Sequence, residues 1–162
     1  MATNDLQLAD EIRQAMGFPT PTSTQLLGFA KAILEELTQN GMATFGGSPT
    51  GHSISGMTAA SLASKIANYA GYGYVSTELL KYSTGVVNYI QASAIVTYVG
   101  PPPPPPDWYL GGTISGIVGS GLAAEIVSQV GYPGTSAPLL AKCTAICDHI
   151  VTNASVISGV IS

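Results

Sequence analysis

One pattern occurs three times along the chain and limits its fold more than any other feature. A glycine followed by an aromatic residue opens each copy, at Gly17-Phe18, Gly71-Tyr72 and Gly131-Tyr132. A short loop then leads to a serine and, three residues later, to a leucine pair. The serines are Ser23, Ser76 and Ser136, and the pairs are Leu26-Leu27, Leu79-Leu80 and Leu139-Leu140. Because a serine before an apolar run is a good helix N-cap, each copy predicts a helix start.

Apolar or small residues continue at helical spacing after each leucine pair. Steps of three and four residues place them on one helix face. The three sets are Leu27, Ala30, Ile33, Leu34 and Leu37; Leu80, Ser83, Val86, Val87 and Ile90; and Leu140, Cys143, Ile146, Cys147 and Ile150. Each helix is predicted to end near Asn40, Ser93 or Asn153, and a short extended or β tail follows it.

A second helical pattern precedes each copy. Its members are Leu8, Ala9 and Ile12; Leu62, Ala63 and Ile66; and Leu122, Ala123 and Ile126. The glycine five residues after each isoleucine is predicted to end that helix in a left-handed conformation. The sequence therefore predicts a mainly α fold of three pseudo-repeats, each a helical hairpin with a short extended or β tail. Their spacing of about 54–60 residues is close to that of known repeat arrays.

These predicted repeats span 1–46, 53–100 and 113–159 within a single domain, 1–162. A Gly-rich linker, 46–56, joins the first two repeats, and a polyproline segment, 101–106, joins the last two. Two alternatives remain for the proline run: a ligand for an aromatic-lined groove, or a stiff spacer of roughly 19 Å. The spacer is favoured because no Arg or Lys flanks the run. The candidate partner-binding residues are Pro101, Pro102, Pro103, Pro104, Pro105, Pro106, Trp108 and Tyr109.

Charged residues make up only 9% of the chain, against about 25% in a typical globular domain. Few charges leave little repulsion between neighbouring molecules and favour an assembled protein. The net charge is −4 and the five cations are scattered, which disfavours nucleic-acid binding. We expect no membrane span, because no window approaches ~20 uncharged apolar residues. The polar, acidic start of the chain predicts no secretory signal.

Cys143, Cys147 and His149 are the residues that most invite a metal site. Aligned on the leucine pairs, however, the cysteines match Ser83 and Val87, which lie on the predicted buried face. We therefore predict two buried free thiols without metal, with His149 on the outer side of its helix. The adjacent Glu35 and Glu36 are predicted to lie on a solvated face. With no phosphate loop or dinucleotide fingerprint either, the sequence predicts neither an enzyme nor a cofactor.

The C-terminal unit reads Ala145-Ile146, Ile150 and Asn153-Ala154-Ser155-Val156 and resembles small structural proteins of tailed bacteriophages. In those proteins a helix ends in Asn or Ser and passes into an extended arm. The resemblance implies a virion component, made in the host cytoplasm, that decorates or cements the capsid or joins tail or baseplate parts. Its expected partners are capsid or tail subunits, in a homo-oligomer or a larger assembly. The alternative is a soluble interaction module that binds a protein partner through its proline-rich segment.

Overall fold

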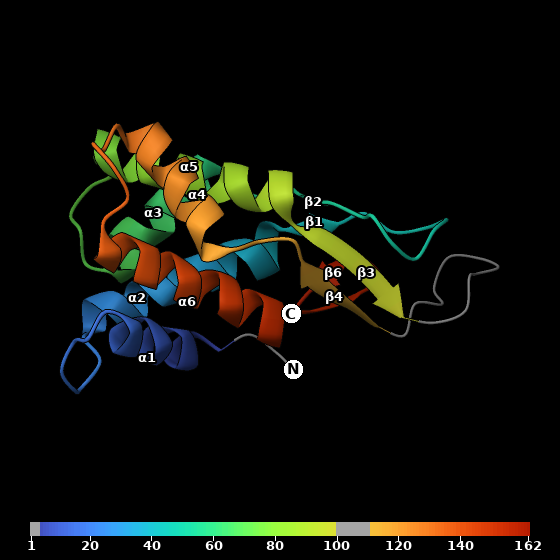
Figure 1. Cartoon of the computed structure of the whole chain (residues 1–162), viewed down its shortest axis with the longest axis horizontal. Coiled ribbons are helices and arrows are strands. Elements are labelled where there is room, and N and C mark those ends of the chain that lie inside the picture. The colour runs from blue at the N-terminus through green and yellow to red at the C-terminus, as the bar shows by residue number, and fades with distance from the viewer. Residues whose placement is uncertain (1–3, 100–110) are drawn as a thin grey trace.

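The computed structural model describes residues 4–99 and 111–162, of which 57% are helical and 14% are in strands. Its α-helices are α1 (Asp5–Ala15), α2 (Thr24–Glu35), α3 (Ala59–Tyr69), α4 (Thr77–Ser93), α5 (Gly119–Val130) and α6 (Ala137–Asn153). A π-helical turn, η1 (Glu36–Asn40), extends α2. The strands are β1 (Met42–Ala43), β2 (Ile54–Ser55), β3 (Ile95–Val99), β4 (Gly111–Ser115), β5 (Ser155–Ile157) and β6 (Val160–Ile161). Figure 1 shows the helices at one end of the molecule and the strands at the other.

The predicted helix starts at the three serines are confirmed. The hydroxyls of Ser23, Ser76 and Ser136 accept hydrogen bonds from the amides of the first leucine of each pair, at 3.1, 3.0 and 3.3 Å. Each bond satisfies an amide that the first turn of a helix leaves free. The glycines that end α1, α3 and α5 have φ angles of +70°, +78° and +87°, which a residue with a Cβ adopts only at a cost.

Most residues predicted to form the core are buried. Those of the first helix in each pair are all buried, and so are those of the second helix beyond the leucine pair. Leu80 and Leu140 are exceptions, because each exposes 40% of its surface. They lie in the first turn of α4 and α6, beside the turns that connect the helices, and the buried face begins one turn later.

The six described helices form a closed ring. Each helix contacts the next one along the chain, and α6 contacts α1. The closest packing joins α4 to α5, two helices that the sequence assigned to different hairpins. Burial of apolar side chains on both flanks of each helix therefore stabilises the ring as one core rather than as three separate hairpins.

Side chains of α4, α6 and η1 bind the residues that cap the other helices. The three bonds join Thr58 N to Glu36 Oε1 at 2.8 Å, Val118 N to Tyr89 Oη at 2.9 Å, and Asn4 N to His149 Nε2 at 3.4 Å. These amides precede α3, α5 and α1. Gly121 leaves room for Tyr89, because a Cβ there would collide with its hydroxyl. The ring is thus closed by polar contacts as well as by its core.

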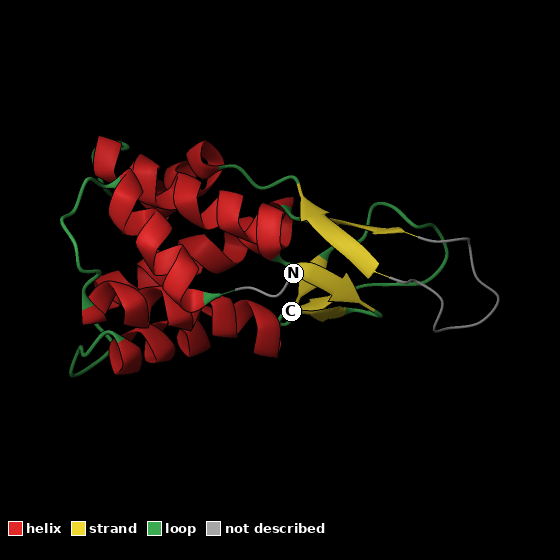
Figure 2. Cartoon of the chain, turned by 90° about the horizontal axis from the view of Figure 1, so that it is seen from below, coloured by secondary structure: helices red, strands yellow, loops and turns green. Residues whose placement is uncertain are grey.

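The strands form one antiparallel sheet in the order β2-β1-β6-β5-β4-β3. It curls into a half-barrel at the end of the helix ring, as Figure 2 shows from below. Residues before β2 approach β3 from its free side: the amides and carbonyls of His52 and Val96 are paired at 2.8 and 3.2 Å, and Tyr98 N donates to Pro49 O at 2.7 Å. These bonds satisfy main-chain groups on what would otherwise be an open edge of the sheet.

The prediction of a mainly α fold built of three repeated hairpins is wrong. The structure is a mixed α/β fold, with six helices and a six-stranded antiparallel half-barrel sheet among the described residues. The tails predicted to follow the hairpins form β1, β3 and β5, and each of them pairs with strands outside those tails: β1 with β2 and β6, β3 with β4, and β5 with β4 and β6. Because an extended segment can satisfy its amides and carbonyls only by pairing, short tails brought to one end of the bundle form a sheet.

Candidate functional site

The outer face of the sheet carries exposed apolar side chains. Strand alternation turns Val96 and Tyr98 toward the core and leaves Ile95 and Val99 facing solvent. The full set is Met42, Ile95, Val99, Ile157 and Val160, which we term the apolar sheet face. Three of them, Met42, Val99 and Val160, expose 65, 65 and 66% of their surface. An apolar face of this kind is typical of a protein–protein contact.

No charge interrupts this face within the described residues. Its remaining exposed strand positions are serines and threonines, among them Ser55, Thr113 and Ser115. Every Asp, Glu, Lys and Arg side chain that the structure describes lies on a helix or on η1. A partner would therefore meet apolar and neutral hydrogen-bonding groups there, with little desolvation of charge.

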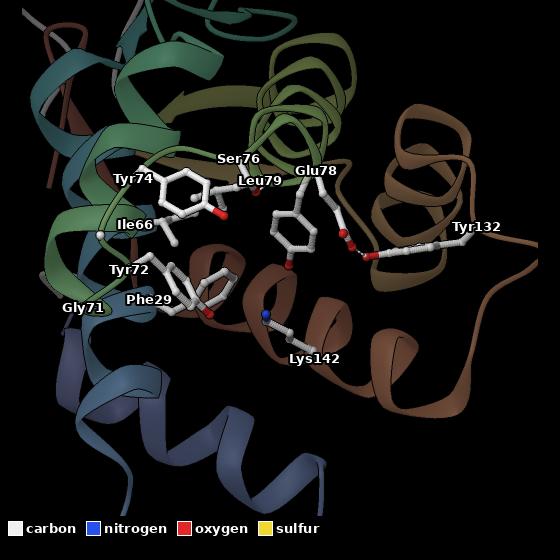
Figure 3. A pocket seen from close by; sticks show the side chains of 12 residues that line it. Phe29, Ile66, Gly71, Tyr72, Tyr74, Ser76, Glu78, Leu79, Tyr132 and Lys142 are labelled. Carbon is white, nitrogen blue, oxygen red and sulfur yellow. Dashed lines mark hydrogen bonds between the residues drawn. The ribbon is translucent and has the colours of Figure 1, made fainter.

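A pocket of about 550 Å³ lies beside the turns that follow α3 and α5 (Figure 3). Its aromatic lining comprises Phe29, Tyr72, Tyr74, Tyr82 and Tyr132. The ring of Phe29 on α2 meets that of Tyr82 on α4 edge-on, with 5.9 Å between centroids. Tyr74 exposes 76% of its surface, so one aromatic wall of the pocket is open to solvent.

Lys142 of α6 projects its amine into the pocket. Its Nζ lies 3.5 Å from the ring centroid of Phe29 and 5.0 Å from that of Tyr82. Burial lowers the pKa of Lys142 from 10.5 to about 8. No carboxylate of the described residues lies within ion-pair distance of it, although aromatic faces attract the cation. The amine is thus a partly buried donor with no anionic partner among the described residues.

Tyr82 adds a second donor without a partner. Its hydroxyl is buried and has no hydrogen-bond partner among the described residues. Burial raises the pKa of Tyr82 well above 10, so the hydroxyl keeps its proton. At the rim, by contrast, Tyr132 Oη donates to Glu78 Oε1 at 2.7 Å, and this bond raises the pKa of Tyr132. An unpaired buried hydroxyl costs stability, which a ligand with an acceptor group would recover.

The predicted burial of Cys143 and Cys147 is confirmed, and both are free thiols. Burial raises the pKa of each to about 12, so both thiols stay protonated near neutral pH. Among residues 4–99 and 111–162 there is no group of three or more His, Cys, Asp or Glu side chains placed to hold a metal ion. The thiols are core side chains in this fold.

Two polar residues expected at the surface are buried, and both expectations are wrong. His149 is 1% exposed: Nε2 accepts from the amide of Asn4, and Nδ1 lies 2.8 Å from Glu11 Oε2. Glu36 is fully buried as well. Burial by itself would raise the pKa of Glu36, but hydrogen bonds from Ser61, Lys65, Thr58 N and Asn40 together lower it. The contacts between α2 and α3, and between α6 and α1, bury these positions.

A shared position in the sequence pattern could have revealed these residues. Glu36, Tyr89 and His149 occupy the same place relative to the leucine pairs, and all three bind the cap of a neighbouring helix. The pocket was missed because its residues come from four helices and two turns. The predicted partner-binding residues, prolines 101–106 with Trp108 and Tyr109, lie outside the described residues.

No known protein family, curated protein or solved structure was found to match this chain. None of the helices in the described ranges is long and apolar enough to span a membrane.

Proposed function

We propose that the chain is a non-enzymatic structural component of a bacteriophage particle, which decorates or cements the capsid or joins tail or baseplate parts. The observation that carries this proposal is the apolar sheet face, exposed and free of charged side chains. A free-standing protein that kept this face in water would be prone to association. In an assembly the same face is buried and contributes to binding.

The contact would use the face of the sheet rather than its edges. The free side of β3 is already bonded to the segment before β2, so strand addition has few open groups there. Burial of Met42, Val160 and Ile157 against a neighbouring subunit would provide an apolar centre, and the serines and threonines around it a neutral rim. Such a contact responds little to salt, because no exposed charges are screened.

The polar groups of the interior also fit a structural role. Both ring nitrogens of His149 are engaged, one by Asn4 N and one by Glu11, so neither is free to act as a base on a substrate. The buried thiols are protonated and are poor nucleophiles. These residues hold the helix ring together.

The first test measures self-association by sedimentation velocity from about 0.05 to 1 M NaCl, where screening of charges increases strongly. We expect oligomers whose affinity changes little with salt. The double variant Ile95→Glu with Val160→Glu should weaken their association, because it places charge on the apolar sheet face. Asn88→Glu, on an exposed position of α4, adds one such charge away from the sheet and should leave association unchanged.

The second test is quantitative mass spectrometry of purified particles of the phage that encodes the chain. We expect the protein at a fixed copy number relative to the major capsid protein, and loss of the double variant from the particles. A strictly monomeric protein that is absent from the particles would contradict the proposal and favour the soluble module.

A further inference from the structure

We propose that the aromatic pocket binds the proline run, residues 101–106, of a second copy of this chain, with that copy's Asp107 beside Lys142. The contact would link copies head to tail. It extends the assembly role proposed above by a second contact surface, which lies beside the turns that follow α3 and α5.

The chemistry of the two surfaces is complementary. Prolines present flat apolar rings and carbonyl acceptors, and they have no amide hydrogen to donate. The pocket presents aromatic faces, the Lys142 amine with no carboxylate of the described residues beside it, and the Tyr82 hydroxyl without a hydrogen-bond partner among them. Aromatic-lined grooves are the usual receptors for polyproline segments, since consecutive prolines favour an extended helix that loses little entropy on docking. The pocket volume of about 550 Å³ is within the range of ligand sites.

Charge supports the same pairing. Lys142 has no acidic partner among the described residues, and a buried cation without one is costly. Asp107 directly follows the last proline in the sequence. Docking the run with Asp107 toward the amine would give this cation its missing carboxylate.

The run cannot reach the pocket of its own chain. The pocket lies at the start of α4, and α4 with its 17 residues and β3 with its 5 then carry the chain away from it. These elements span about 25 Å and about 16 Å. Val99 and Gly111 are paired at the far end of the sheet, so a segment between them extends at most about 20 Å beyond that end. Only a run from another copy can fill the pocket.

The consequence is a heterologous contact, in which one end of each copy binds the opposite end of the next. Repetition of such a contact gives a ring or an open chain, depending on the rotation between copies. The sheet face adds contacts of a different kind, so separate variants can disable each surface.

The test uses a labelled, end-capped peptide of residues 99–110, titrated into the full chain and followed by fluorescence anisotropy. We expect saturable binding, weakened at least tenfold by Lys142→Met and severalfold by Tyr82→Phe or by Asn in place of Asp107 in the peptide. Tyr74→Ala should also weaken it, and this exposed side chain can be removed without disturbing the core. A peptide with Gly and Ser in place of the prolines should not bind.

Circular dichroism would establish that each variant folds. Absence of binding at millimolar peptide would overturn the proposal, as would binding that Tyr74→Ala and Lys142→Met leave unchanged, which would place the peptide on another surface. The double variant of the sheet face should bind the peptide like the parent chain. Failure of the pocket contact can therefore be told apart from failure of the proposed function, which rests on the sheet face.

Discussion

Glu36 and Lys65 form an ion pair, with 2.9 Å between Oε2 and Nζ, at a site where the glutamate side chain is fully buried. The pair joins the end of α2 to α3. The corresponding contact between α6 and α1 joins His149 Nδ1 to Glu11 Oε2 at 2.8 Å. Here the carboxylate lies on α1, the helix that is contacted, and not on α6. Glu36 and His149 each also accept a hydrogen bond from the N-cap residue of the neighbouring helix, Thr58 and Asn4. Polar side chains therefore fix how these neighbouring helices meet.

Removal of the Glu36 carboxylate is predicted to destabilise the fold strongly. Glu36→Gln should lower the free energy of unfolding by about 3 kcal/mol, because Lys65 and the other donors lose their charged acceptor. The measurement is urea denaturation at pH 7. Glu125→Gln, on α5, removes a carboxylate that accepts a hydrogen bond from the nearby Gln129, and should cost less than about 0.5 kcal/mol.

The Glu36 carboxylate is also expected to make the folded protein less stable in acid. The pKa of Glu36 in the folded state is lowered, so its contribution is fully present above the unfolded pKa, near 4.5. That contribution is lost as the pH falls through the lower, folded pKa. Glu36→Gln should therefore flatten the dependence of stability on pH in this acidic range, and an unchanged pH profile would contradict the role assigned to Glu36.

Lys142→Met is predicted to stabilise the fold near neutral pH, by about 1–3 kcal/mol, since burial of the ammonium is costly. The folded pKa of about 8 lies below the ordinary 10.5, so the unfolded chain binds more protons between these values. The cost is therefore present below pH 8 and disappears as the pH rises toward 10.5. The stability of the variant relative to the parent should shrink between pH 7 and pH 10.

Urea denaturation of both proteins at these two pH values provides the measurement. Titration of the thiols and tyrosines affects parent and variant alike, so it largely cancels in the difference. Lys81→Met, which removes an exposed lysine of α4, is the control and should change stability by less than about 0.5 kcal/mol at either pH. An equal gain at pH 7 and pH 10 would show that Lys142 is not desolvated.

The thiols of Cys143 and Cys147 are predicted to resist alkylation in the folded protein. Their pKa values of about 12 leave almost no thiolate at pH 8, and their burial blocks access. Mass spectrometry after treatment with iodoacetamide should find both unmodified without denaturant and both modified in urea. Above pH 9 the unfolded thiols lose protons that the folded ones keep, so these residues should lower stability as the pH rises toward 12. Rapid modification of the native protein would contradict this burial.

Local spacing along the chain is enough to predict where α2, α4 and α6 begin and which faces the helices bury. Ser23, Ser76 and Ser136 cap their helices as predicted, and the periodic apolar residues lie in the core. These features are local: a cap joins residues three apart, and a helix face depends on steps of three and four. The three glycines before the loops were predictable for the same reason, because a left-handed residue ends a helix within one turn.

The pairing of the strands and the surroundings of the polar residues depend on contacts between distant segments of the chain. Met42 pairs with Val160, far along the chain, and strands of two to five residues carry too little pattern to predict such a partner. The surroundings of His149 depend on α1, which begins at the other end of the sequence. Lys142 has its lowered pKa because α2 and α4 bring Phe29 and Tyr82 against it. Burial of a charge and pairing of strands are both set by segments distant in sequence, which no local spacing encodes.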